Sequence, residues 1–208
     1  MIKIKSRIRK KNLRAAPIMT RRTIVLASAS PRRRDLLREH GFKVRIKPAD
    51  IEELMPRHLT VGEATLLNAQ RKARAVARTE RASLVLAADT LVAIGGRILG
   101  KPRDFDEAFE MLSLLSGNTH EVFSGVWLIC KAAKKNCGFI EVSRVRFRKL
   151  TPAEIREYMR RIGPLDKAGA YAAQQNEMEV IASIQGSRTN VVGLPMEKLS
   201  AALRMFES

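Results

Sequence analysis

Residues 26–37, LASASPRRRDLL, join an apolar segment to the start of a helix and decide how this 208-residue chain begins its fold. The run TIVLAS at residues 23–28 predicts a buried strand. Ser30 is a typical N-cap and is followed by proline, so a helix is expected over residues 31–40, with Gly41 after its end. The sequence therefore predicts a strand that turns directly into the N-terminus of a helix.

Three arginines, Arg32, Arg33 and Arg34, fall in the first turn of this predicted helix. Unpaired N–H groups and the helix dipole make that end partly positive, so cations are disfavoured there. A bound anion reverses the balance, because guanidinium groups pair with phosphate oxygens, and Ser28 and Ser30 add hydroxyl donors. The pattern predicts a phosphate site; the alternative is a solvated basic helix start, at a cost of up to ~1 kcal/mol per charge. Without a ligand, Arg33 is expected to be repelled by the dipole, so that its removal does not destabilise the protein.

The net charge of +18 indicates an acidic partner, but half of it lies in residues 1–22, which hold nine Lys or Arg and no acid. These residues have no apolar signal core and are expected to be a disordered basic extension, or an upstream extension with the true start at Met19, ahead of a domain over residues 23–208. Cys130 and Cys137 fit no disulfide framework or metal spacing, which predicts reduced thiols and a cytoplasmic location. No run approaches the ~20 apolar residues of a membrane span.

The rest of the chain alternates helix and strand patterns without an internal repeat, which indicates an α/β fold with a mixed sheet and flanking helices. Thr60 and Glu63 form a capping box, and Gly95-Gly96 predicts a hairpin turn. A further turn is expected at KKNCG, residues 134–138. Additional strands are predicted at residues 42–48, 83–94, 119–132, 139–150 and 179–184, and additional helices at residues 60–78, 104–115, from about 152, and 193–206.

Asp89 follows the apolar run LVLAA inside a predicted strand, where a bare carboxylate is costly. Its partner is expected to be a metal ion or a catalytic water, and the alternative is a paired structural aspartate. Glu52 and Glu53, in a predicted loop, could complete a divalent-metal site, since Mg²⁺ usually takes one or two carboxylates and shares substrate phosphates.

Several other polar residues are candidates for contact with a ligand. Lys101 in LGKP and Lys72 on the helix before Asp89 could bind phosphate, although a solvated charge is the alternative for each. In LDKAGAYAAQQ, Asp166, Lys167 and Gln174 accompany small residues, and the amide of Gln174 could recognise a base edge. The alternative for this segment is a packed connector.

Six motifs occur in order along the chain: LASASPRRRDLL, AADTLV, GKPRD, LSGNTHEVFSGV, PLDKAGAYAAQ and NVVGLP. Together they resemble the Maf family of nucleoside triphosphate pyrophosphatases, over about residues 24–206. The resemblance implies hydrolysis of a nucleoside triphosphate between the α and β phosphates, assisted by a divalent cation such as Mg²⁺ or Mn²⁺. It also implies a Maf/ITPase-like fold of two lobes around a central cleft, and a homodimer.

The same resemblance implies roles for individual residues. Asp89 matches the family's catalytic base, and Asp89 and Glu53 match its metal ligands. The substrate-binding positions match Ser28, Arg32, Arg33, Glu53, Lys72, Thr90, Lys101 and Gln174.

Three positions that separate the branches of the family are Arg32, Thr90 and Gln174 in this chain. They look like the dTTP/UTP branch; a 7-methyl-GTP pyrophosphatase is the alternative, and that branch departs from arginine at the first position. The chain itself departs from the family at Gln175, where glycine is usual, which bears on base preference rather than on reaction type.

A basic nucleic-acid-binding protein is the alternative from a different functional class. The chain has no RRM, KH, zinc-finger or clear helix-turn-helix pattern, so nucleic acid is expected, if at all, at the basic extension.

Overall fold

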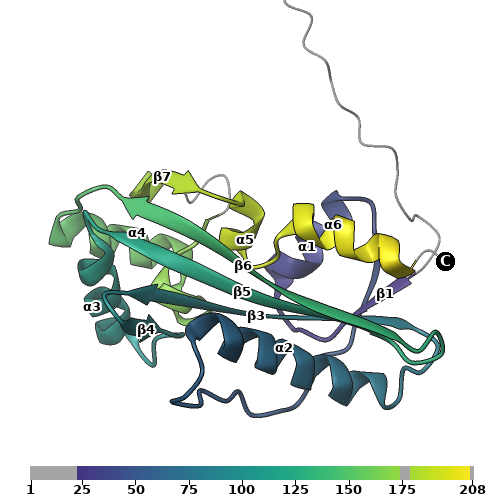
Figure 1. Ribbon diagram of the computed structural model, residues 1–208. Coiled ribbons are helices and arrows are strands. Elements are labelled where there is room, and N and C mark those ends of the chain that lie inside the picture. Colours follow the sequence, from purple (N-terminus) through teal and green to yellow (C-terminus); the bar gives the residue numbers. More distant parts are fainter. Residues whose placement is uncertain (1–22, 174–178, 207–208) are drawn as a thin grey trace, which may run out of the picture.

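A seven-stranded mixed sheet organises the computed structural model, which describes residues 23–173 and 179–206 (Figure 1). The strand order is β2-β1-β3-β5-β6-β7, and β4 pairs with β3. β1 is parallel to β2 and β3, and the other pairs are antiparallel. The strands are β1 (Thr23–Leu26), β2 (Lys43–Ile46), β3 (Leu84–Ile94), β4 (Arg97–Leu99), β5 (Thr119–Cys130), β6 (Lys135–Phe147) and β7 (Ile181–Gln185). The helices are α1 (Pro31–Glu39), α2 (Val61–Ala77), α3 (Phe105–Leu115), α4 (Pro152–Ile162), α5 (Arg188–Val192) and α6 (Met196–Leu203), with 3-10 turns η1 (Pro164–Asp166), η2 (Ala168–Ala170) and η4 (Arg204–Phe206).

Local capping and turn signals set most of the predicted boundaries, and these are confirmed. Ser30 caps α1 by accepting a hydrogen bond from the backbone N–H of Arg33. Thr60 and Glu63 form the reciprocal capping box of α2. The Gly95-Gly96 pair, with φ of +53° and +78°, closes the β3–β4 hairpin. The α/β class with a mixed sheet and flanking helices is likewise confirmed.

Two predicted boundaries are wrong. The turn between the long strands lies at residues 131–134, because β6 pairs with β5 from Lys135 opposite Cys130 onward, and β6 ends at Phe147. The closing helix predicted over residues 193–206 is confirmed as α6 followed by η4, but it starts later, at Met196, and the short helix α5 precedes the predicted range. Gly193, with φ of +119°, ends α5, and Pro195 precedes the start of α6.

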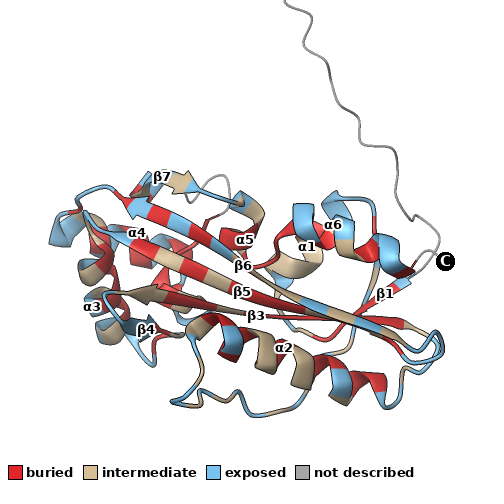
Figure 2. Ribbon diagram, in the orientation of Figure 1, coloured by how far each residue is buried: buried red, intermediate tan, exposed pale blue. Residues whose placement is uncertain are grey.

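The buried side chains form three clusters around the long strands β3, β5 and β6. One cluster includes residues of α3 and α4, a second those of β1, α1 and α6, and a third those of α2. Figure 2 shows buried positions along β3 and β5 and on the helices that cover them. By strand register, the first two clusters lie at opposite ends of β3 and β5. The division into two lobes stays a prediction.

Candidate active site

A cavity of about 550 Å³ opens where one edge of β3 is left uncovered. β1 pairs with residues 84–86 of β3 and β4 with residues 92–94, so within the described residues no strand covers residues 87–91 on that edge. β1 and β4 run toward this gap from opposite directions. Ser28 and Lys101, which follow the carboxyl ends of these two strands, therefore line the cavity. Ligand sites in α/β sheets commonly lie beyond the carboxyl ends of strands.

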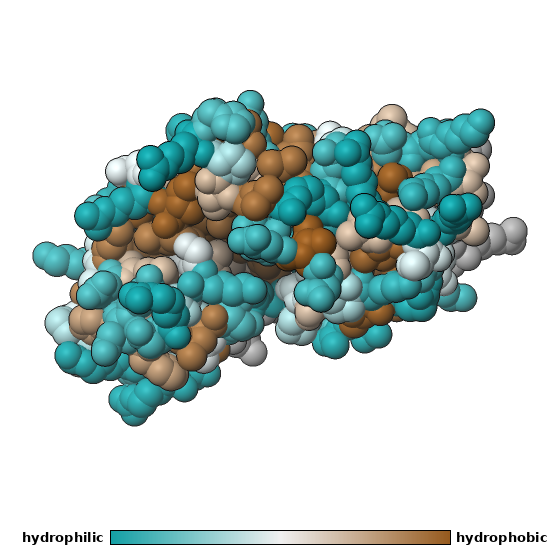
Figure 3. Space-filling view, turned by 90° about the horizontal axis from the view of Figure 1, so that it is seen from below, coloured by the Kyte–Doolittle hydropathy of each residue, from teal (hydrophilic) through white to brown (hydrophobic). Residues whose placement is uncertain are grey.

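The gap makes side chains from both faces of β3 available to one cavity. Asp89 and Thr90 are neighbours on the strand and point to opposite faces, yet both line the cavity. Figure 3 shows apolar side chains gathered around a hollow on this side of the molecule, with polar residues over the surrounding surface.

A glycine brings α2 close to the sheet beside Asp89. Gly125 of β5 pairs with Asp89, and a Cβ at Gly125 would lie 2.3 Å from backbone atoms of α2 at Thr65 and Leu66. Only glycine permits this approach of helix to strand. The close packing places Asn68 and Lys72, about one and two turns further along α2, within reach of the Asp89 carboxylate.

Asp89 is paired on both carboxylate oxygens and is only 4% exposed. Lys72 donates to its Oδ1 (2.7 Å), and the amide of Asn68 donates to its Oδ2 (3.3 Å). Lys72 also donates to Glu53 Oε1 (2.5 Å). Asn68 exchanges two hydrogen bonds with the backbone of Leu54, which fixes the loop that carries Glu53. The sheet, α2 and this loop together orient a buried carboxylate, as burial of a charge requires.

Glu53 and Glu52, the two acids proposed for a metal, separate in the structure. Glu53 lines the cavity, whereas Glu52 does not, and the backbone carbonyl of Glu52 accepts a hydrogen bond from Arg71. Of these two acids, only Glu53 is a candidate ligand.

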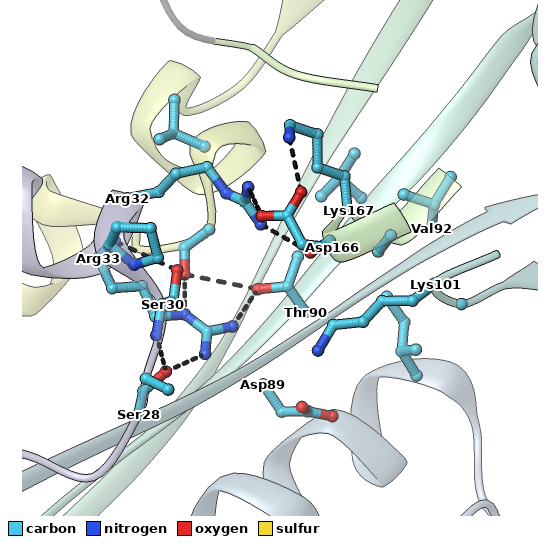
Figure 4. Close-up of a pocket in the computed structure, with 18 of the residues that line it drawn as sticks. Ser28, Ser30, Arg32, Arg33, Asp89, Thr90, Val92, Lys101, Asp166 and Lys167 are labelled. Carbon is cyan, nitrogen blue, oxygen red and sulfur yellow. Dashed lines mark hydrogen bonds and ion pairs between the residues drawn. The ribbon is translucent and has the colours of Figure 1, made fainter. Parts of the chain in front are cut away.

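Arg33 lies at the centre of a hydrogen-bond network (Figure 4). Its Nε donates to the carbonyl of Gly193 (2.9 Å), its Nη1 to Ser28 Oγ (3.0 Å) and its Nη2 to Thr90 Oγ1 (3.0 Å). The Thr90 hydroxyl is also 2.9 Å from Ser124 Oγ. Burial lowers the pKa of the Arg33 guanidinium below its usual value, and the nearby Asp89 charge opposes this shift. The expectation that ligand-free Arg33 is merely repelled by the helix start is therefore wrong, because acceptors from distant segments hold it.

The other two arginines of α1 have different environments. Arg32 lines the cavity and donates to Asp166 through Nη1 to the carboxylate (2.8 Å) and Nη2 to the carbonyl (3.1 Å). Arg34 does not line the cavity and pairs with its neighbour Asp35 (2.7 Å). The prediction of three phosphate-binding arginines is wrong for Arg34.

Two lysines that line the cavity, Lys167 and Lys101, also have different environments. Lys167 donates to Asp166 and to the carbonyls of Ile162 and Gly163, so it caps the end of α4. Lys101 is exposed. It is the one cation of the cavity lining that makes no hydrogen bond or ion pair among the described residues. It therefore remains available to an anion. Gln174 lies outside the described residues.

The remaining lining is apolar and belongs mainly to the cluster around α3 and α4. It includes Val92, Val122, Tyr171, Ala172, Ala173, Val191 and Val192. The cavity thus offers cations and hydroxyls together with an apolar wall, a combination that suits a ligand with phosphates at one end and a ring at the other.

A sequence profile described as Maf-like protein matches residues 23–206. The chain belongs to the Maf-like family. It is 46% identical over 183 residues to a Pelotomaculum thermopropionicum protein named dTTP/UTP pyrophosphatase, with 88% of this chain and 96% of that protein covered. A Bacillus cytotoxicus protein of the same name is 43% identical, with 88% and 95% covered. A solved HAM1 protein from Coxiella burnetii shares the fold, with a TM-score of 0.51, 17% identity, and 89% and 100% of the two chains covered.

The acids of this Maf-like protein suit a divalent cation that the substrate helps to bind. Asp89 and Glu53 converge on one ammonium group, so both carboxylates reach the same region of the cavity. The described residues contain no group of three or more His, Cys, Asp or Glu placed to hold a metal. Mg²⁺ and Mn²⁺ accept one or two carboxylates plus phosphate oxygens and water, so this donor set fits such an ion only when a phosphorylated ligand is bound.

Some residues of the Maf-like site gave no separate signal in the sequence. Ser124 and Gly193 act through Arg33 and Thr90, and their contacts join positions far apart in the chain. The motifs FSGV and NVVGLP contain them, but no local rule assigns them partners.

In the described part of the chain, no helix is both long enough and apolar enough to cross a membrane.

Proposed function

We propose that this Maf-like protein hydrolyses dTTP and UTP to the monophosphate and pyrophosphate. One observation carries the proposal: the buried, oriented carboxylate of Asp89 faces a cavity that also holds Arg32, Arg33, Lys72 and Lys101. Polyphosphate needs that density of positive charge. The two relatives named dTTP/UTP pyrophosphatase cover nearly the whole matched domain, which supports the same substrates here.

The residues of the cavity suggest a division of labour in this reaction. Asp89 accepts a proton from a water that attacks the α-phosphorus, and the bond from that phosphorus to the bridging oxygen of the β-phosphate breaks. Pyrophosphate leaves with the bridging oxygen. Arg32, Arg33, Lys72 and Lys101 offset the charge that develops on it, and their fixed positions reduce the cost of reorganisation.

A bound divalent cation, held by Asp89, Glu53 and phosphate oxygens, would supply further charge neutralisation and lower the pKa of the attacking water. We therefore expect removal of metal with EDTA to slow turnover by about 100-fold or more, and Mg²⁺ or Mn²⁺ to restore it. Glu53→Gln should raise the metal concentration that gives half-maximal rate. Full activity in excess EDTA would contradict the proposed cofactor.

A nucleotide panel tests the proposed function directly. Pyrophosphate release is measured from dTTP, UTP, CTP, GTP, ATP and 7-methyl-GTP under identical conditions. The expected result is a preference for dTTP and UTP, with the nucleoside monophosphate as the other product. A preference for 7-methyl-GTP would move the protein to the alternative specificity, and no pyrophosphate from any nucleotide would reject the proposal. The role of Gln174 in base choice stays a prediction, and Gln174→Ala tested on the same panel addresses it.

Lys101 supplies a second test, because its ammonium group makes no hydrogen bond or ion pair with the described residues that the Lys101→Ala variant would lose. Lys101→Ala is expected to raise KM for dTTP by about tenfold, the effect of losing one charge-assisted contact, with an unchanged melting temperature. Exposed Lys43 does not line the cavity, so Lys43→Ala is the control and should change neither quantity. An unchanged KM in Lys101→Ala would exclude Lys101 from the phosphate site.

We also propose that the protein acts in the cytoplasm as a homodimer, as the family resemblance and the two free cysteines suggest. Residues 1–22, where nucleic-acid binding was expected, lie outside the described residues. Light scattering of the purified protein measures the oligomeric state.

A further inference from the structure

The segment formed by residues 171–173 lines the apolar side of the cavity without regular secondary structure. Its three residues, Tyr171, Ala172 and Ala173, are 6%, 2% and 3% exposed. Buried backbone of this kind needs partners for its N–H and C=O groups from outside the segment. We call residues 171–173 the wall, and the residues that supply these hydrogen-bond partners fix its shape.

Tyr158 supplies both partners for the middle residue of the wall. This residue of α4 is 1% exposed. Its hydroxyl accepts a hydrogen bond from the Ala172 N–H (3.1 Å) and donates one to the Ala172 carbonyl (3.2 Å). No residue of α4 lines the cavity. The helix therefore contacts the wall from behind and fixes the wall backbone with a single oxygen atom.

The neighbouring side chain has a separate anchor. The hydroxyl of Tyr171 lies 2.9 Å from His120 Nε2, and the Tyr171 ring packs edge-on against His120 and Phe147. Burial lowers the pKa of His120 to about 4, so the imidazole is neutral at pH 7 and acts as a hydrogen-bond partner rather than a charge. His120 thus fixes the ring of the wall, whereas Tyr158 fixes its backbone.

We infer that Tyr158 is a positioning residue for the base of the nucleotide. Tyr158 lies behind the wall, so it contacts neither the reacting phosphates nor the base. It holds Ala172 in the position where the wall packs against the flat ring of the base. The inference rests on the proposed function and assigns the base to the wall of residues 171–173. The phosphates then lie against the cations on the other part of the lining.

The test removes one atom. Tyr158→Phe keeps the packed ring and leaves the N–H and C=O of Ala172 without their partner, a change that is costly for buried groups. KM for dTTP and UTP should rise about fivefold or more, with kcat within about twofold. The inhibition constant for pyrophosphate, which needs only the cationic part of the cavity, should stay unchanged. Amide hydrogen exchange in a peptide containing Ala172 should become faster.

Ser116 provides a matched control. Its hydroxyl donates to the Leu150 carbonyl (3.3 Å) and accepts from the Leu150 N–H (2.7 Å), the same pair of bonds that Tyr158 makes to Ala172. Neither Ser116 nor Leu150 lines the cavity. Ser116→Ala should therefore lower the melting temperature without changing KM for either nucleotide.

The possible results distinguish a failure of the role of Tyr158 from a failure of the proposed function. Wild-type pyrophosphate release is measured first, and an inactive wild type overturns both the proposed function and the role of Tyr158. With an active wild type, an unchanged KM in folded Tyr158→Phe overturns the positioning role alone. An equal rise in KM for Ser116→Ala, or a parallel rise in the pyrophosphate inhibition constant, also overturns it, because either would indicate a general loss of stability rather than a displaced base wall.

Discussion

Replacement of Asp89 by asparagine is expected to reduce turnover by about 100-fold or more while the fold persists, since asparagine cannot accept the proton of the attacking water. The carbonyl oxygen of the new amide can still accept a hydrogen bond from Asn68 or Lys72, and Lys72 keeps its ion pair with Glu53. The loss should therefore appear in kcat, measured by pyrophosphate release under saturating dTTP. Circular dichroism and the melting temperature check that the variant is folded.

A second aspartate separates catalysis from the general effect of charge removal. Asp104 caps α3 by accepting from the Glu107 N–H and lies outside the cavity. Asparagine is also a good N-cap, so Asp104→Asn should keep both activity and stability. If folded Asp89→Asn turned over at a rate near that of the wild type, Asp89 would be a structural partner of Lys72 and the proton would have to go elsewhere.

Features governed by neighbouring residues could be predicted from the sequence. The capping box at Thr60–Glu63 forms within a single helical turn, so the identity of the two residues nearly determines the contact. The strand-to-helix turn at Ser30 follows the same logic. Asp89 could be selected because a carboxylate in an apolar strand is costly without a partner, and the structure supplies that partner in Lys72.

Features that depend on distant contacts could not be predicted in this way. Arg33 and Arg34 are adjacent and chemically identical, yet one lines the cavity and the other pairs with Asp35. The difference arises because Arg33 meets the Gly193 carbonyl, 160 positions along the chain. In the same way, the role of Gly125 depends on where α2 packs. Local rules give no account of such pairings, because they arise only when the sheet has assembled.

Arg33→Ala is expected to lower both activity and stability. The variant loses three hydrogen bonds from one charged group, to Ser28, Thr90 and Gly193, and leaves their oxygens without this donor. We expect the free energy of unfolding to fall by about 2 kcal/mol, since several such bonds outweigh the relief of repulsion at the helix start. Loss of a fixed cation beside the leaving pyrophosphate should also lower kcat/KM by about 100-fold.

Two further variants identify which property of Arg33 matters. Arg33→Lys keeps the charge but cannot reach three acceptors with one planar fork, so it should recover part of the activity and little of the stability. Arg34→Ala serves as the control on the same helix turn, because Arg34 donates its side-chain hydrogen bonds to Asp35 and does not line the cavity; its activity should be unchanged. A melting temperature for Arg33→Ala equal to or above that of the wild type would mean that repulsion by the helix dipole outweighs the network. That result would reinstate the simpler view in which the arginine is retained for phosphate alone.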